Sequence, residues 1–546
     1  MEVVRIMKQV GAILLDTHSI QKYVFSCNKL KTNTGASYLV DSIFTDAMMS
    51  VLAKYKFVMP QKSWMDIDGV EMKNDDNIEC EVAYIGGGNM LILVADTDNN
   101  FKLCKEIVSK WSEKILLQAP GLKTVVAVGF IELDDEHFKK SLDNLYRILK
   151  ENQNNILPQV DLPYTGLTLE CDYSGKTADA VIDGECRRVA AEIKAKMEAF
   201  NCSADKVRED YKDLLGKEYD FCSELEEIGY KDGESYISII HIDGNNMGVK
   251  FSACRKVAER KQLSINVAKI VKDGFRQLVS SIIAEYDRYA DVLDMHKLIT
   301  GKKKILPLRP IIVGGDDVTF ICPGKLALTY AKRFIEYVNK YELINDEFHG
   351  HIIKELRNRE NYAPNVQISK CLSCCAGVAI IPAKYPFFRG YELAEQLCSA
   401  AKEKSRSDDG CYLDYMILHG EMSSELPQLR RQQYHGVAGN LHYGPYNVLN
   451  KQAGNKYIGR LLDLSLKLQG EKIAQNKVKD LREVLHEDLH KQEIFLENAD
   501  SLHDLLKAAS GNDKLTANAL WEKDVEGKPV TRFIDAIELM DFVYEG

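Results

Sequence analysis

Two adjacent acidic residues, Asp316 and Asp317, follow two glycines between apolar segments of the chain. The run VGGDDV at residues 313–318, with Gly314 and Gly315 at its turn, predicts a tight β-hairpin, because glycine tolerates positive φ. Two carboxylates at one hairpin tip repel each other and lose hydration, so a purely structural role would be costly. A divalent cation removes that repulsion, and Mg²⁺ binds well to one or two carboxylates together with substrate phosphates.

A third acidic residue, Asp243, ends the apolar segment YISIIHID at residues 236–243. In a sheet where this strand lies beside the hairpin, its carboxylate would converge with Asp316 and Asp317. Three such carboxylates are predicted to hold two Mg²⁺ or Mn²⁺ ions about 3.5–4 Å apart, which stabilise the attacking and leaving oxygens of an in-line displacement. The pattern therefore predicts nucleotidyl transfer from a nucleoside triphosphate.

The phosphates of such a substrate need hydrogen-bond donors and positive charge nearby. Backbone amides that open a predicted helix are expected to cradle the triphosphate, and they belong to Gly244, Asn245, Asn246, Met247 and Gly248. Lys402 and Lys404, with Arg406, end a later predicted helix and would reach a β- or γ-phosphate. The alternative for these basic residues is a solvated helix face.

The elements that must position these residues occur twice along the chain. A strand ending in Asp, a helix, a glycine hairpin, a helix and a strand appear in residues 1–150 and again in residues 235–420. This order predicts an α+β fold with two ferredoxin-like palm domains of the GGDEF and polymerase type. Residues 151–234 are expected to form a helical connector, and residues 421–546 a C-terminal helical domain that braces the second palm.

The first palm departs from the metal-binding pattern. Asp16 ends its first strand and corresponds to Asp243, but its hairpin reads GGGN at residues 86–89. One carboxylate with an amide is a poor Mg²⁺ site. This palm is therefore predicted to be catalytically silent, although its glycine turn and Ser37 remain candidates for binding a nucleotide.

Length and composition limit the remaining classes of protein. A chain of 546 residues favours several domains, and a net charge of −10 argues against a protein that is basic overall and binds nucleic acid non-specifically. No apolar run approaches the roughly 20 residues needed to span a bilayer, and the 14 cysteines lack paired CxxC spacing. We expect a cytoplasmic protein with reduced thiols and no membrane partner.

These motifs resemble the large palm-domain subunit of type III CRISPR effector complexes, the Cas10, Cmr2 and Csm1 group. The similarity covers both palms and extends into the C-terminal helices. It is carried by LPLRPIIVGGDDVTFICP, HIDGNNMG, GVAIIPAKYPFFRGYELAEQLCSAAKEKSR, LHYGPYNV and, in the first palm, SIQKYVFSCNKLKTNTGASYLVDSIF with the GGGN hairpin. Many relatives begin with an HD nuclease domain, whereas this sequence starts at the first palm.

The resemblance implies that ATP is converted to cyclic oligoadenylate messengers in antiviral defence, triggered by foreign RNA. Asp316 would be the main metal ligand, with Asp243 and Asp317 completing the site. Other effector subunits, with guide and target RNA, would be the partners. Whether the protein works alone or within such a complex stays open.

Three other interpretations remain. The enzyme could be a cyclic dinucleotide cyclase that uses GTP, since base choice depends on pocket residues that the sequence does not locate. Both palms could be inactive, which would make the chain a nucleotide-binding scaffold subunit. His486 and His490 match the HExxH pattern of zinc proteases, with both histidines expected on one helix face, although no clear third ligand follows at the spacing of a known protease family.

Overall fold

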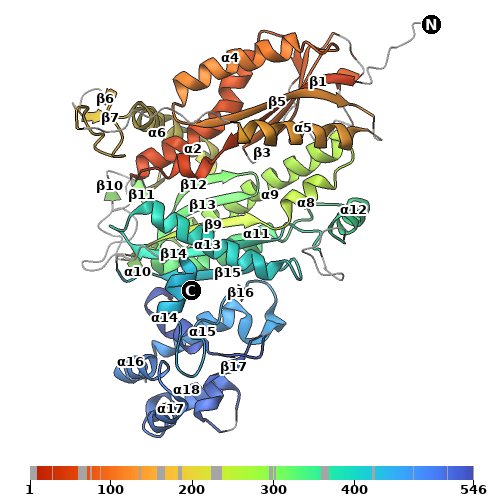
Figure 1. The fold of residues 1–546 in the computed structure, drawn as a ribbon. Coiled ribbons are helices and arrows are strands. Elements are labelled where there is room, and N and C mark those ends of the chain that lie inside the picture. The colour runs from red at the N-terminus through yellow and green to blue at the C-terminus, as the bar shows by residue number, and fades with distance from the viewer. Residues whose placement is uncertain are drawn as a thin grey trace.

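The computed structural model shows two palms and a C-terminal helical region that follow one another along the molecule (Figure 1). It describes residues 9–27, 29–58, 71–73, 75, 77–86, 88–134, 137–155, 166–182, 187–222, 236–293, 299–300, 303–357, 368–420, 425–470, 473–512, 514–524 and 526–544. Gly87 of the first glycine hairpin lies outside these residues.

The first palm is built on a five-stranded sheet of order β2-β3-β4-β1-β5. Its strands are β1 (Gln9–His18), β2 (Phe57–Val58), β3 (Cys80–Gly86), β4 (Asn89–Val94) and β5 (Lys123–Glu132). Its helices are α1 (Ile20–Val24), α2 (Leu30–Ser42), η1 (Ile43–Met48), α3 (Met49–Leu52), α4 (Lys102–Gln118) and α5 (Phe138–Asn154). In β1, Ile13 and Leu15 pack in one core with α4, whereas Ala12 and Leu14 pack in the other with α5. Both faces are buried, which explains the nearly continuous apolar strands.

The second palm has a six-stranded sheet of order β12-β13-β9-β14-β15-β16. Its strands are β9 (Tyr236–Gly244), β12 (Arg309–Gly314), β13 (Asp317–Pro323), β14 (Cys374–Pro382), β15 (Tyr412–Ile417) and β16 (Tyr446–Asn447). Its helices are α8 (Met247–Ser252), α9 (Val257–Ala284), α10 (Tyr286–Leu293), α11 (Ala327–Val338), α12 (Asp346–Arg357) and α13 (Phe387–Ser405). In both palms the hairpin pairs with the first strand, β1 or β9, and the strand on the other side of that first strand is β5 or β14. The predicted α+β fold with two ferredoxin-like palms is confirmed.

The two palms pack against each other within the chain, a point that the sequence leaves open. Lys261 on α9 of the second palm forms a buried ion pair with Glu81 on β3 of the first, at 2.8 Å. Phe25, which follows α1, stacks on Tyr391 of α13 with ring centroids 3.8 Å apart. A buried ion pair and an aromatic contact therefore hold the two palms together within the chain.

The connector is only partly helical. It contains α6 (Ala191–Asp210), α7 (Lys212–Leu215) and the short strands β6 (Ala180–Ile182), β7 (Arg187–Val189) and β8 (Tyr219–Phe221). β8 pairs in parallel with β11 (Lys303–Leu306), which also pairs with β10 (Ile299–Thr300). The boundary expected at residue 150 falls inside α5, which continues to Asn154.

The C-terminal region is mainly helical and is tied to the second palm through a buried polar cluster. Its elements are α14 (Leu426–Gln433), α15 (Ile458–Leu468), α16 (Gln475–Val484), α17 (Leu489–Leu496), α18 (Asp500–Ser510), α19 (Phe533–Leu539), β17 (Glu522–Lys523) and β18 (Pro529–Val530). His442 lies between Asp414 of β15, at 3.1 Å, and Asp535 of α19, at 3.3 Å. Arg430 of α14 donates to Asp414, and Tyr446 of β16 donates to Asp535.

The HExxH segment does not form one helix. α16 ends at Val484 and α17 begins at Leu489, with Asp488 accepting hydrogen bonds from the backbone amides of His490 and Lys491 as an N-cap. The N-cap preference of aspartate breaks the helix between the two histidines, so they do not share a helix face. The prediction that His486 and His490 lie on one helix face, which the zinc-protease interpretation requires, is therefore wrong.

Among the helices that the structure describes, none combines the length and the apolar character that a membrane span requires.

Candidate active site

The three predicted carboxylates come from adjacent strand ends of the second palm. Asp243 on β9 lies directly opposite Asp317 on β13 in the antiparallel ladder, which places side chains about 4.5–5.5 Å apart at Cβ. Asp316 sits at the hairpin tip, where its carbonyl accepts a hydrogen bond from the Gly244 amide at 3.1 Å. A β-carbon on Gly244 would approach that of Asp316 to 2.9 Å, so this close contact requires glycine.

The turn itself depends on Gly315, whose φ is +58°. This left-handed conformation is easy for glycine and strained for most other residues. The glycine pair predicted from the sequence therefore has two separate roles. Gly315 closes the hairpin, while Gly314 ends β12 opposite Asp317.

Clustering changes the acidity of these groups. Burial, and then the charge of Asp243, raise the pKa of Asp316 to about 7 and that of Asp317 to about 8. Burial also lowers the pKa of His241, so this ring is neutral beside Asp317 and supplies no positive charge. One oxygen of Asp317, Oδ1, is buried without a hydrogen-bond partner within the described part of the chain, although His241 Nδ1 is 3.3 Å away. Such a group is stabilised by a cation.

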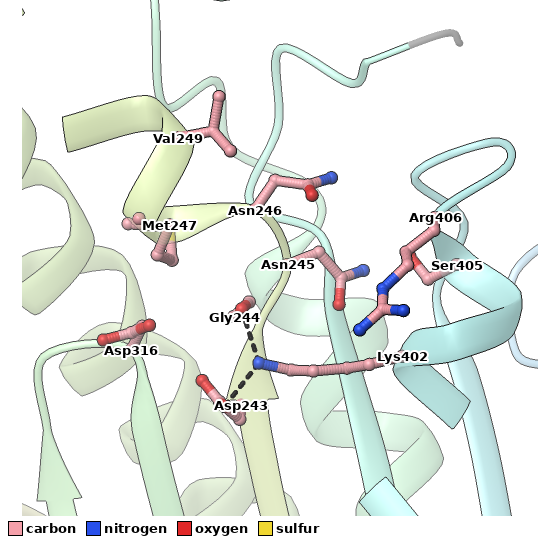
Figure 2. A pocket seen from close by; sticks show the side chains of 11 residues that line it. Asp243, Gly244, Asn245, Asn246, Met247, Val249, Asp316, Lys402, Ser405 and Arg406 are labelled. Atoms are coloured by element: carbon pink, nitrogen blue, oxygen red, sulfur yellow. Dashed lines mark hydrogen bonds and ion pairs between the residues drawn. The ribbon is translucent and has the colours of Figure 1, made fainter. Parts of the chain in front are cut away.

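Lys402 approaches the same site from the last turn of α13. Its ammonium forms an ion pair with Asp243 and donates a hydrogen bond to the Gly244 carbonyl at 3.0 Å (Figure 2). Burial disfavours its charged form, but the Asp243 carboxylate outweighs burial, so the pKa of Lys402 is raised. Lys402 therefore adds a positive charge to the cluster of three carboxyl groups.

A cavity of about 390 Å³ opens beside this cluster. It is lined by Asp243, Gly244, Asn245, Asn246, Met247, Gly248, Val249, Asp316, Lys402, Ser405 and Arg406. Figure 2 shows Lys402 and Arg406 on one side of the cavity and the loop that follows β9 on the other. Side chains and backbone from both segments thus face one space.

The structure brings together most, but not all, of the residues expected to bind phosphate. All five residues of the loop 244–248 line the cavity, as does Lys402, whereas Lys404 does not. Helix α8 has only six residues, so positive charge comes chiefly from Lys402 and Arg406 and little from a helix dipole. Ser405 was not predicted, although its place nearly one helical turn after Lys402 is a signal that could have revealed it.

Two further cavities lead from the hairpin into the space between the palms. One, of about 710 Å³, joins Gly314, Gly315 and the three aspartates to the first palm. Its lining there includes Thr17, Ser37, Gly86 and Gly88. The other, of about 480 Å³, runs from Asp316 to Tyr84, Tyr146 and Arg260. Asp316 lines all three cavities, so groups bound in any of them would meet at the hairpin tip.

The first palm repeats this geometry without the acidic cluster. Asp16 lies opposite Asn89, and the Thr17 amide donates to the Gly88 carbonyl at 2.9 Å. The Asp16 carboxylate accepts a hydrogen bond from Gln153 at 2.7 Å. An amide partner and a single carboxylate suit a structural turn better than a metal site.

Comparisons with known proteins identify a family and solved structures that this chain resembles. Residues 236–410 match the family model for the second palm domain of Cas10/Cmr2. Among solved structures, the Csm1–Csm4 cassette in complex with cA3 aligns with TM-score 0.51 and 12% identity, over 98% of this chain and 70% of that chain. The cassette in complex with pppApApA gives TM-score 0.50 and 12% identity, over 99% and 70%.

Csm1 from T. onnurineus gives TM-score 0.50 and 13% identity, over 98% of this chain and 70% of that chain. No curated protein matches the sequence. At these identities the structural likeness shows a shared fold that extends over nearly the whole chain, and the expected family resemblance is confirmed. Residues 236–410, which carry the hairpin aspartates, Asp243 and Lys402, belong to the Cas10/Cmr2 family as its second palm domain.

Proposed function

We propose that the second palm is a metal-dependent nucleotidyltransferase that converts ATP to cyclic oligoadenylates. The observation that carries this proposal is the meeting of three carboxylates, from β9 and the β12–β13 hairpin, beside a cavity lined by Lys402 and Arg406. Carboxylates that bind cations and basic groups that bind phosphates are the two requirements of phosphoryl chemistry.

The donor set fits a pair of divalent cations. The oxygens of Asp243, Asp316 and Asp317 are hard ligands of the kind that Mg²⁺ and Mn²⁺ prefer, and the buried Oδ1 of Asp317 accepts no hydrogen bond from the described residues. When bound there, the ions would neutralise charge on the attacking and leaving oxygens. The remaining work belongs to the chain's own groups.

Those groups bind and orient the substrate. Lys402 and Arg406 would bind the triphosphate, and the amides of residues 244–248 would donate hydrogen bonds to its oxygens. The cavities that reach Ser37 and Tyr146 have room for nucleosides between the palms. The first palm thus serves as a wall of the site, and its glycine turn with Ser37 contacts a second nucleotide.

ATP is proposed as the substrate because structures with the same fold carry cA3 and pppApApA. Those proteins are assembled with Csm4, which supports a place for this chain in an effector complex with other CRISPR subunits, guide RNA and target RNA. We propose that such a complex acts in the cytoplasm in antiviral defence.

The decisive experiment identifies the product. Purified protein is incubated with ATP or GTP and Mg²⁺ or Mn²⁺, alone and with partner subunits and target RNA, and products are analysed by mass spectrometry. Cyclic oligoadenylates are expected from ATP. A cyclic dinucleotide from GTP would establish the alternative cyclase, and no product under any condition would favour a nucleotide-binding scaffold.

A further inference from the structure

Asp409, which lies outside the cavity, is joined to the loop that lines it. Its Oδ1 accepts a hydrogen bond from the side-chain amide of Asn246 at 2.8 Å, and its Oδ2 accepts one from the backbone amide of Ser369 at 3.0 Å. Only 3% of Asp409 is exposed. Both carboxylate oxygens are therefore engaged in the interior, one of them by a residue that lines the cavity.

Both partners of this contact have an unusual backbone. The φ of Asn246 is +56° and that of Asp409 is +51°, whereas the other described residues with positive φ, glycines excepted, are Ser19 and Phe101. Left-handed conformations cost a non-glycine residue free energy and persist where surrounding contacts enforce them. Two such residues that bond to each other beside a cavity indicate that the arrangement of the two loops is held in place.

The same contact joins the two walls of the cavity. Asp409 follows α13, and its amide donates to the carbonyl of Ser405 at 2.7 Å, close to Lys402. Asn245, in the other wall, donates its side-chain amide to the Gly410 carbonyl at 3.1 Å. The loop after β9 and the end of α13 are thus tied together at two successive residues on each side.

We propose that Asp409 is a positioning residue that sets the affinity of this site for a nucleoside triphosphate. It holds the backbone of residues 244–248 at a fixed separation from Lys402 and Arg406, so that donors from both walls reach one polyphosphate. This inference rests on the proposed nucleotidyl-transfer function. A site that is already held in its binding geometry loses less conformational entropy when the ligand binds. Loosening the site therefore weakens binding first.

The test compares variants for binding of α,β-methylene-ATP with Mg²⁺ by calorimetry, alongside thermal unfolding. Asp409→Ala removes both acceptors. Asn246→Gly allows the left-handed backbone conformation but deletes the side-chain amide that donates to Asp409. This variant remains informative if Asp409→Ala fails to fold. Each is expected to raise the dissociation constant about tenfold, or about 1.4 kcal/mol. Asp408→Asn is the matched control, because it removes the same charge from a side chain that contacts Gly410 and Tyr412; its change should stay below about twofold.

A double variant separates positioning from general destabilisation. If Asp409 acts through Asn246, the double variant binds about as weakly as either single variant, because the second change removes a contact already lost. Asp409→Asn should fall between wild type and Asp409→Ala, since one acceptor oxygen remains. Wild-type affinity in Asp409→Ala and Asn246→Gly, or fully multiplicative effects in the double variant, would overturn the inference.

The binding readout also keeps the two proposals apart. A wild-type protein that binds the analogue but forms no product would contradict the proposed chemistry, while the variants would still test Asp409. A wild type that makes product and is unaffected in affinity by Asp409→Ala would contradict only the positioning role. Absence of any binding by the wild type would contradict both.

Discussion

Asp243 and Asp317 occupy directly opposed positions on β9 and β13, and the corresponding pair in the first palm is Asp16 and Asn89. Two hairpin positions therefore distinguish a palm with three carboxylates from a palm with one, because Gly88 and Asn89 stand where the second palm has Asp316 and Asp317. The two palms share one backbone contact at this place, because the amide that follows the strand-end aspartate donates to a hairpin carbonyl in each. The two palms therefore share a fold and differ in the side chains that their hairpins offer for chemistry.

Replacing either hairpin carboxylate by its amide should abolish product formation. Asp316→Asn and Asp317→Asn keep the side-chain shape and remove a cation ligand, so a loss of at least about a hundredfold in kcat/KM is expected. Without metal ions, the unfolding temperature should stay equal or rise, because a repelling charge is gone. Turnover within about tenfold of wild type would contradict the assignment.

Asp16→Ala should leave the chemistry largely intact. Its carboxylate is bound by Gln153, and Asn89 opposite it offers no charge. We expect product formation to fall less than about tenfold, a barrier change below about 1.4 kcal/mol. A loss as deep as that of Asp316→Asn, measured in the same assay, would show that the first palm takes part in catalysis.

Lys402 and Lys404 provide a matched pair of basic residues on one helix. Lys402 contacts Asp243 and lines the cavity, whereas Lys404 does not line it. Lys402→Met should therefore raise KM for ATP and lower kcat/KM about thirtyfold or more, and Lys404→Met should change either constant less than about threefold. Steady-state kinetics with purified variants decides the matter; equal losses would mean that both lysines reach the phosphates.

Much of the site could be predicted from the sequence because its parts are local signals. A glycine pair before two aspartates, and an aspartate at the end of an apolar strand, each have one simple structural explanation. Asp409 had no such signal, since its role depends on Asn246, which lies far away in the chain and meets it only after folding. The spacing of His486 and His490 does not predict the break between them, because that break depends on Asp488 acting as the N-cap of α17.

The buried His442 predicts a pH-dependent link between the second palm and the C-terminal helices. Burial and Arg430 lower its pKa, but Asp535 and Asp414 outweigh them and raise the pKa from 6.5 to about 8. The folded state then binds this proton more tightly than the unfolded state. Its stabilising contribution, about 2 kcal/mol, is complete below pH 6.5 and is lost as the pH rises through about 8.

Thermal unfolding of wild type and His442→Gln across this range measures that contribution. The difference in stability between the two proteins should shrink as the pH rises from 6.5 to above 8. The comparison with the variant removes the effect of the hairpin aspartates, whose raised pKa values act in the same direction. A difference that does not change with pH would show that folding does not raise the pKa of this histidine.

Two ion pairs between the palms differ in burial and should differ in their contribution to stability. Glu81 and Lys261 have side chains only 2% and 7% exposed, and the second oxygen of Glu81 accepts a hydrogen bond from the Met72 amide at 2.9 Å. Glu81→Gln removes the carboxylate charge that faces the buried Lys261 ammonium, a loss that typically costs about 3 kcal/mol. Glu355→Gln breaks the pair with Lys139, whose side chains are 32% and 37% exposed, and should cost only about 0.5 kcal/mol because water and salt already screen that pair. The denaturant midpoints of the two variants, measured at equal ionic strength, test this difference. A larger loss of stability for Glu355→Gln would mean that the exposed contacts at the rim stabilise the interface of the palms more than the buried contacts do.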